Sequence, residues 1–181
     1  MAKIYNEKYE TMEREELKKL QLQRLKQMVD YSIDNVPFYK EKLSKAGITS
    51  SKCIEKLEDI EKIPFTTKED IRNNYPDGFL AVPMNNISRV HASSGTTGKP
   101  TIGYYTKNDM EVWADAAARV LCLNGLTKDD IMQISVGYGL FTGAFGFHQG
   151  AEKIGCTIVP ASTGNTQKQL VMMHDIGVTV L

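Results

Sequence analysis

The chain has 181 residues and a mass of 20.3 kDa, which is enough for one domain of ordinary size. Its 22 Lys and Arg residues balance 22 Asp and Glu residues, so no net charge attracts it to nucleic acid or to an anionic membrane. No apolar run approaches the about 20 residues of a membrane span, and the charged amino terminus lacks the apolar stretch of a secretory signal. The three cysteines are widely spaced without a C-x-x-C pair, so we expect neither disulfides nor a zinc site, and we expect a cytoplasmic location.

Residues 1–80 are predicted to form a helical amino-terminal segment. Four apolar residues at helical spacing predict a helix over residues 12–35: Leu22, Leu25, Val29 and Ile33. We expect Thr11 to cap the start of this helix, because threonine is a favoured N-cap residue. We expect Pro37 to end it, because proline disfavours helical geometry at the residue before it.

Two further helices are predicted in this segment. The first covers residues 38–46, with Gly47 as its stop. The second begins at an S/T-x-x-E capping box formed by Thr66 and Glu69 and runs towards Asn74. These helices are typical of a cap on another unit and predict no chemistry by themselves.

Residues 81–181 alternate between strands and helices. Strands are predicted over residues 87–92, 101–106, 131–136, 156–159 and 178–181, and helices over residues 108–124, 144–154 and 166–175. This alternation is typical of βαβ units, so we expect an α/β fold with a mainly parallel sheet and helices on both of its faces. The last strand begins only at Val178, and we therefore expect the sheet to be incomplete at the carboxyl end.

The segment Ser93–Thr101, with the sequence SSGTTGKPT, connects two predicted strands. Its two glycines let the backbone approach an anion, its hydroxyl and backbone N–H groups can donate hydrogen bonds, and Lys99 adds a positive charge. A hydrogen bond to a charged group contributes roughly 1.5–3 kcal/mol, so several would hold a polyphosphate. From the residues alone, this segment is either a phosphate-binding loop or an ordinary turn rich in Ser, Thr and Gly.

A Walker A loop is excluded for this segment. Ser93 stands where the pattern G-x-x-x-x-G-K-[ST] needs its first glycine, and Pro100 stands where it needs the hydroxyl that binds magnesium. Proline also has no N–H to donate to a phosphate, and a strand rather than a helix is predicted after it. We therefore exclude a P-loop nucleoside triphosphatase.

Residues 94–100 (SGTTGKP) resemble the phosphate-loop signature of the adenylate-forming superfamily, which contains acyl-CoA synthetases, luciferases and the adenylation domains of peptide synthetases. Three more segments resemble the phenylacetate–CoA ligase branch of that superfamily: residues 31–39 (YSIDNVPFY), 63–70 (IPFTTKED) and 138–160 (YGLFTGAFGFHQGAEKIGCTIVP). The resemblance runs from about Tyr5 to Leu181, which is nearly the whole chain.

The resemblance implies an ATP-dependent ligase of phenylacetate catabolism that works in two steps. The carboxylate of the acid attacks the α-phosphate of ATP, giving an acyl adenylate and pyrophosphate, and the thiol of CoA then attacks the acyl carbon and releases AMP. ATP and CoA are the implied cosubstrates, Mg²⁺ is the implied metal and a homodimer is the implied assembly. The implied ATP phosphate-binding residues are Ser93, Ser94, Gly95, Thr96, Thr97, Gly98 and Lys99.

The loop Gly137–Gly143 follows a predicted buried strand, at the end of the strand where open α/β sheets bind ligands. Taken by themselves, its aromatic residues are better explained as packing in the core. With the resemblance we expect an aryl-acid pocket, whose implied substrate-binding residues are Tyr138, Phe141, Gly143 and Ala144. The acid itself is left open, because phenylacetate, a hydroxylated relative and an indole acid all need an aromatic pocket.

The remaining polar candidates are expected to be structural. His91 is expected to be packed or to cap a strand. His148 and His174 lie on predicted helices without a partner at ligand spacing, so no metal site is predicted. Asp129 and Asp130 follow a turn and are expected to be solvated or to cap it.

Other motifs of the superfamily have no match in this chain, namely the adenine-contacting aromatic motif, the ribose-binding Asp, the hinge and the catalytic Lys. We expect them downstream of Leu181. Residues 81–181 are therefore expected to be the first part of a truncated AMP-binding domain, and the isolated chain is expected to be inactive. Two alternatives stay open: a non-catalytic nucleotide-binding fragment, and a phosphotransferase that uses the same loop.

Overall fold

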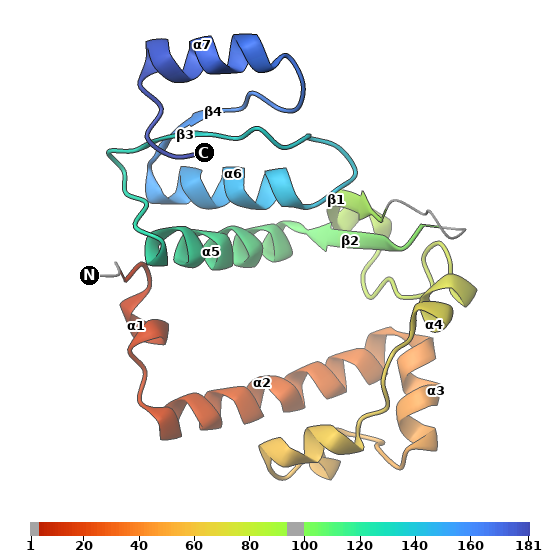
Figure 1. The fold of residues 1–181 in the computed structure, drawn as a ribbon. Coiled ribbons are helices and arrows are strands. Elements are labelled where there is room, and N and C mark those ends of the chain that lie inside the picture. Colours follow the sequence, from red (N-terminus) through yellow and green to blue (C-terminus); the bar gives the residue numbers. More distant parts are fainter. Residues whose placement is uncertain (1–3, 94–99) are drawn as a thin grey trace.

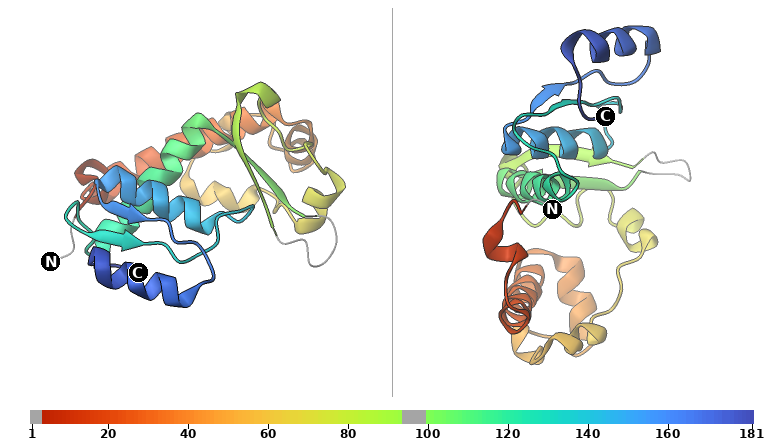
Figure 2. Two further views of the ribbon diagram at one scale, coloured as in Figure 1. Left: turned by 90° about the horizontal axis from the view of Figure 1, so that it is seen from above. Right: turned by 60° about the vertical axis from the view of Figure 1, so that its left-hand side comes forward.

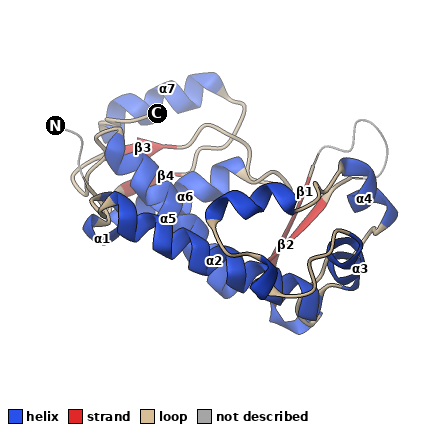
Figure 3. Cartoon of the chain, turned by 90° about the horizontal axis from the view of Figure 1, so that it is seen from below, coloured by secondary structure: helices blue, strands red, loops and turns tan. Residues whose placement is uncertain are grey.

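The computed structural model describes residues 4–93 and 100–181, and its elements succeed one another as an amino-terminal group of helices, a β-hairpin and an α/β layer (Figure 1). Helices make up most of the regular structure, and the strands are short (Figure 3). Within the described residues, no helix is both long and apolar enough to cross a membrane.

The amino-terminal helices are α1 (Glu7–Glu10), α2 (Arg14–Asn35) and α3 (Pro37–Lys45). The predicted cap at Thr11 is wrong, because residues 7–10 form a helix of their own and Thr11 ends it, its hydroxyl donating to the Glu7 carbonyl at 2.7 Å. The predicted end of α2 before Pro37 is confirmed, since α2 stops at Asn35. Pro37 itself opens α3, where its missing N–H costs no hydrogen bond.

The predicted apolar stripe of α2 faces the core of this part. Val29 is buried together with Leu43, Ile48 and Ile54. The other three members of the stripe, Leu22, Leu25 and Ile33, pack against this cluster. Burial of apolar surface therefore holds the amino-terminal helices together.

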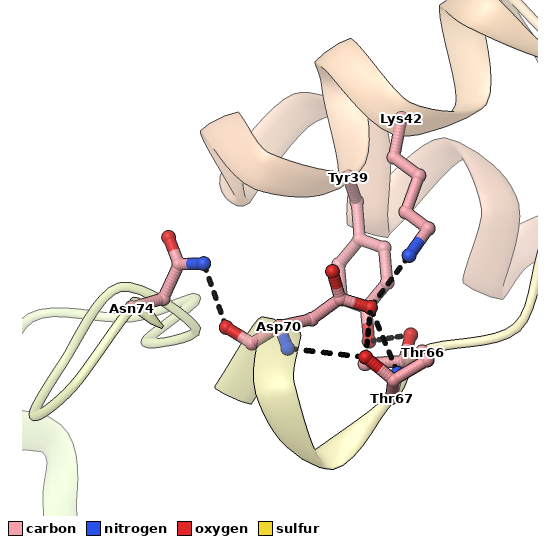
Figure 4. Close-up of polar contacts among 6 residues, drawn as sticks. All are labelled: Tyr39, Lys42, Thr66, Thr67, Asp70 and Asn74. Carbon is pink, nitrogen blue, oxygen red and sulfur yellow. Dashed lines mark hydrogen bonds and ion pairs between the residues drawn. The ribbon is translucent and has the colours of Figure 1, made fainter. Parts of the chain in front are cut away.

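The segment that follows contains three 3₁₀ turns and one helix: η1 (Ser51–Cys53), η2 (Leu57–Lys62), α4 (Lys68–Asn73) and η3 (Met84–Asn86). The predicted capping box is present but begins one residue later, at Thr67 (Figure 4). The Thr67 hydroxyl accepts from the Asp70 N–H at 3.1 Å, and the Asp70 carboxylate accepts from the Thr67 N–H at 2.8 Å. The acidic residue of the box is therefore Asp70 and not the predicted Glu69. Asp70 also accepts a hydrogen bond from the Lys42 ammonium of α3 at 2.6 Å.

The hairpin consists of β1 (Ile87–Ala92) and β2 (Ile102–Thr106), which pair antiparallel with Ala92 opposite Ile102. A short connection between two neighbouring strands favours antiparallel pairing, because parallel pairing needs a crossover connection of about a dozen residues or more. The two strands form a separate sheet. Ser93 and Thr101, the described residues next to the two paired strand ends, therefore lie side by side at the loop end of the hairpin.

The α/β layer contains α5 (Lys107–Leu123), β3 (Ile131–Gln133), α6 (Gly143–Ile154), β4 (Thr157–Val159) and α7 (Thr166–Ile176). β3 and β4 pair parallel, and Val180 forms a further parallel bridge with Met132 on the other side of β3. Helices α6 and α7 lie on opposite faces of this pair (Figures 1 and 2). The expected α/β class with βαβ units is confirmed by this parallel pairing.

Glycines on α6 let it lie close to α5. A Cβ atom built on Gly150 would stand 2.7 Å from the Cβ of Ala117 and 2.8 Å from the backbone nitrogen of Ala118. A Cβ on Gly146 would stand 2.6 Å from the Nε1 atom of Trp113. All three distances are shorter than van der Waals contact, so the two helices can be this close only because these positions lack a side chain.

We predict that Gly150→Ala lowers the free energy of unfolding by about 1–3 kcal/mol, because the new methyl group meets the backbone of α5, which cannot move aside cheaply. Chemical denaturation measures the change. Gly143→Ala in the same helix is the control, since nothing lies within 4 Å of a Cβ built there. Equal stability of the two variants would contradict the close packing of α5 on α6.

Two carboxylates in the amino-terminal part are predicted to govern acid stability. Bonds from the Lys42 ammonium and the Thr67 N–H hold the pKa of Asp70 at about 2. Bonds from the Lys56 N–H and the Lys62 ammonium hold the pKa of Asp59, whose side chain is 5% exposed, at about 2. Both carboxyls bind a proton more weakly in the folded than in the unfolded chain, so their stabilisation is complete above about pH 4 and is lost between about pH 4 and pH 2.

The measurement is the free energy of unfolding as a function of pH for the wild type and for Asp70→Asn. We expect the variant to be less stable at neutral pH and to lose less stability on acidification, because it has one shifted carboxyl fewer. Asp34→Asn, at an exposed position, serves as the control. Parallel pH curves for the wild type and Asp70→Asn would show that Asp70 does not titrate as described.

Candidate functional site

The base of the predicted phosphate loop is closed by two hydrogen bonds. The Ser93 N–H donates to the Thr101 carbonyl at 3.0 Å, and the Thr101 N–H donates to the Ser93 hydroxyl oxygen at 2.9 Å. Ser93 is exposed, and its hydroxyl proton remains able to donate to a ligand. The other predicted phosphate-binding residues, Ser94, Gly95, Thr96, Thr97, Gly98 and Lys99, lie outside the described residues.

The aromatic loop, residues 137–143, is joined to the end of β1 through a single carbonyl group. The carbonyl oxygen of Leu140 accepts from the Ala92 N–H at 3.0 Å and lies 3.0 Å from the Nδ1 atom of His91. The segment expected to bind the aryl acid therefore lies beside the strand that leads into Ser93, the first residue expected to bind ATP.

Tyr138 is half-buried, and its hydroxyl is engaged within the protein. The Tyr138 ring meets the Phe145 ring edge to face at 5.3 Å, and its hydroxyl lies 3.0 Å from the Nδ1 atom of His148. The Nε2 atom of His148 lies 3.2 Å from the Glu152 carboxylate, which as an ion can only accept, so Nε2 donates. Burial, and then the charge of Glu152, raise the pKa of Tyr138, so this hydroxyl stays protonated at neutral pH.

The other three predicted substrate residues occupy different surroundings. Phe141 is 61% exposed, and Gly143 is exposed at the first turn of α6. Ala144 is only 1% exposed and belongs to the buried cluster of the α/β layer, with Tyr138 packed against it. Phe141 and Gly143 are therefore accessible to a ligand, while Ala144 and most of the Tyr138 ring pack in the core beneath the loop.

A hollow of about 330 Å³ lies between the two loops. Its walls come from the base of the phosphate loop on one side and from the aromatic loop on the other, and Tyr105 of β2 also lines it. Its lining residues are His91, Ala92, Ser93, Thr101, Ile102, Gly103, Tyr105, Phe141 and Thr142. Phe141 is thus placed beside Ser93, although 48 positions of sequence separate them.

Sequence reasoning missed two members of this site. His91 was expected to be packed, which is confirmed, but its contact with Leu140 was not foreseen. Thr142 also lines the hollow and was not predicted. The position of His91 directly before the loop was the available signal, but sequence spacing alone could not identify its partner 49 residues away.

A larger hollow of about 550 Å³ lies elsewhere, between α5, the end of β3 and α6, and most of its lining is apolar, including Val120, Leu121, Ile134, Val136, Phe147 and Val180. It contains none of the predicted site residues. Within residues 4–93 and 100–181, no group of three or more His, Cys, Asp or Glu side chains could hold a metal ion.

Curated relatives of this chain are phenylacetate-coenzyme A ligases. The chain is 48% identical over 172 residues to a phenylacetate-coenzyme A ligase of Thermus thermophilus, which covers 95% of this chain and 38% of that protein. It is 47% identical over 166 residues to a phenylacetate-coenzyme A ligase of Escherichia coli K12, covering 92% of this chain and 38% of that protein. The resemblance stated from the sequence is confirmed, and the chain spans about 38% of the length of these relatives. No family model matches the chain.

The solved structures show the same relationship in three dimensions. The fold is similar to that of 2-hydroxyisobutyryl-CoA ligase in complex with 2-HIB-AMP and CoA, with a TM-score of 0.85 and 31% identity over 94% of this chain and 37% of that chain. An open conformation of the same ligase gives a TM-score of 0.86 and 29% identity over 96% of this chain and 41% of that chain. The similarity therefore extends from the sequence to the arrangement of the elements.

The engaged hydroxyl of Tyr138 can be tested by titration. We predict that the ultraviolet absorbance difference between the wild type and Tyr138→Phe shows one tyrosine ionising above the ordinary pKa of about 10, because burial and Glu152 both oppose the charged form. Tyr31→Phe, at an exposed position of α2, is the matched control. A difference curve for Tyr138 centred at or below the ordinary pKa would contradict the described surroundings.

Proposed function

We propose that this chain forms part of an ATP-dependent acid–CoA ligase and that its acid substrate is phenylacetate or a close aryl relative. The observation that supports this most directly is the shared hollow, where the base of a Ser/Thr/Gly loop stands opposite an exposed aromatic ring. The similarity to curated phenylacetate-coenzyme A ligases supports the same reaction class.

The proposed reaction begins with formation of an acyl adenylate. The aryl acid lies against Phe141, its carboxylate attacks the α-phosphate of ATP, and pyrophosphate leaves. The thiol of CoA then attacks the acyl carbon and AMP leaves. Such steps require positioning and charge stabilisation more than a protein nucleophile, which is the chemistry that a loop of N–H groups, hydroxyls and one lysine provides.

The proposal also assigns a role to each part of the site. Residues 93–99 are proposed to hold the β- and γ-phosphates, with the hydroxyl of Ser93 at the base of the loop and Lys99 as the positive charge. Phe141 and Gly143 are proposed to contact the acid, with Tyr138 and Ala144 behind them. In this assignment, residues 1–80 are a helical segment and residues 81–181 are the first part of an AMP-binding domain.

Among the described residues, no group of three or more His, Cys, Asp or Glu side chains could hold magnesium without ATP. We therefore assign no step of the reaction to a metal held by this chain, and magnesium belongs to the proposal only as the partner of ATP. A homodimer and a cytoplasmic location remain predictions of the sequence.

The proposal is tested by ATP–pyrophosphate exchange with phenylacetate. We expect no exchange from the 181-residue chain alone, because it spans about 38% of the length of the ligases it resembles. We expect exchange from a chimera in which the Thermus thermophilus relative supplies the portion that this chain does not span. Exchange by the chain alone would contradict the first expectation, and formation of ADP by the chimera would favour a phosphotransferase.

Within the chimera, Lys99→Ala should reduce exchange by roughly 10- to 100-fold, which corresponds to the loss of one hydrogen bond to a charged group. Lys107→Ala is the matched control, because Lys107 is an exposed lysine at the start of α5, outside the loop. Equal activity of the two variants would contradict the assignment of the phosphate loop.

A further inference from the structure

His91 is almost completely buried at the junction of the two loops. It is 3% exposed, and its ring lies 5.5–5.6 Å from the rings of Tyr105, Trp113 and Phe145. Its Nε2 atom is buried without a hydrogen-bond partner among the described residues. Within residues 4–93 and 100–181, the imidazole therefore makes one directed polar contact, between Nδ1 and the Leu140 carbonyl at 3.0 Å.

The direction of this hydrogen bond follows from its chemistry. A carbonyl oxygen has no proton to give, so the Nδ1 atom of His91 must carry the hydrogen and donate it. The same carbonyl oxygen also accepts from the Ala92 N–H, so both of its acceptor positions are used by neighbouring residues of β1. Two donors from the same strand fix the orientation of the carbonyl group. With one donor alone, the carbonyl group could rotate about that hydrogen bond.

The held carbonyl lies in the middle of the aromatic loop. Tyr138 precedes Leu140 and packs on the core, while Phe141 and Thr142 follow it and line the hollow. Across the hollow stand Ser93, which directly follows the strand that bears His91, and Thr101, which directly precedes β2. The separation of the two walls therefore depends on the contact between β1 and Leu140.

We propose that His91 is a positioning residue that holds the Leu140 carbonyl and thereby sets the distance between Ser93 and Thr101, at the base of the phosphate loop, and Phe141 and Thr142 of the aromatic loop. This role rests on the proposed function, because it matters for activity only if ATP and the acid meet in this hollow. The role requires the hydrogen on Nδ1 of His91, which donates to Leu140, whereas packing alone would not require it.

Two substitutions separate this role from simple packing. Asn places an amide N–H close to the position of Nδ1 but fills less space, whereas Phe fills the space among the aromatic rings but has no donor. If His91 positions Leu140, then His91→Asn preserves the loop and His91→Phe disturbs it. If His91 only packs, His91→Phe preserves the loop and His91→Asn disturbs it.

The experiment is nuclear magnetic resonance of the ¹⁵N-labelled 181-residue chain. We expect the imidazole spectrum of the wild type to show the hydrogen on Nδ1, and we expect the amide signals of Phe141 and Thr142 to stay in place in His91→Asn and to shift in His91→Phe. A wild-type tautomer with its hydrogen on Nε2 alone would overturn the proposal, even if a variant failed to fold. So would Phe141 and Thr142 signals that shift in His91→Asn but not in His91→Phe.

Titration with ATP and then with phenylacetate distinguishes this proposal from the proposed function. We expect ATP to shift the signals of Ser93 and Thr101 in every variant, and the shift to extend to Phe141 and Thr142 only in the wild type and His91→Asn. An equal response of Phe141 and Thr142 in His91→Phe would overturn the positioning role. Absence of any ATP response in the wild type would count against the proposed function, and the ligand-free spectra would still decide the role of His91.

Discussion

The carbonyl group of Leu140 is the contact on which the arrangement of the site depends. It accepts hydrogen bonds from His91 and Ala92, two neighbouring residues at the end of β1, and so attaches the aromatic loop to the strand that enters the phosphate loop. β1 and β3 lie in different sheets, so no strand pairing joins the two loops, and this contact connects the aromatic loop directly to β1. One backbone acceptor thus brings together two segments far apart in the sequence.

The close packing of α5 and α6 also holds the His91 side chain in place. Gly146 lets α6 approach the indole of Trp113, and the same indole lies 5.5 Å from the ring of His91. Phe145, the residue before Gly146, contacts both His91 and Tyr138. Because aromatic pairs prefer particular edge-to-face geometries, this cluster restricts the orientation of the His91 ring as well as its place.

Residues 1–80 are attached to the hairpin and the α/β layer by polar contacts. Arg119 of α5 forms an ion pair with Glu10 at 3.2 Å, and the Tyr104 hydroxyl of β2 donates to the Pro76 carbonyl at 3.2 Å. Their apolar cluster, by contrast, is made of their own residues. The two parts therefore have separate cores, and Figure 2 shows the helices standing to one side of the layer.

The sequence alone predicted the ends of α2, α5 and α6 to within a few residues. Helical spacing and stop residues such as Gly155 depend only on nearby residues of the chain, so they can be read from the sequence. Choices between equivalent neighbours needed the tertiary structure: Thr67 caps α4 because its partner Asp70 also binds Lys42 of α3. The site was predicted as two loops, but their meeting was not, because a bond between β1 and Leu140 spans almost fifty residues and leaves no periodic signal. Sequence thus determined which residues stand in each loop, and only long-range packing decided that the loops face one another.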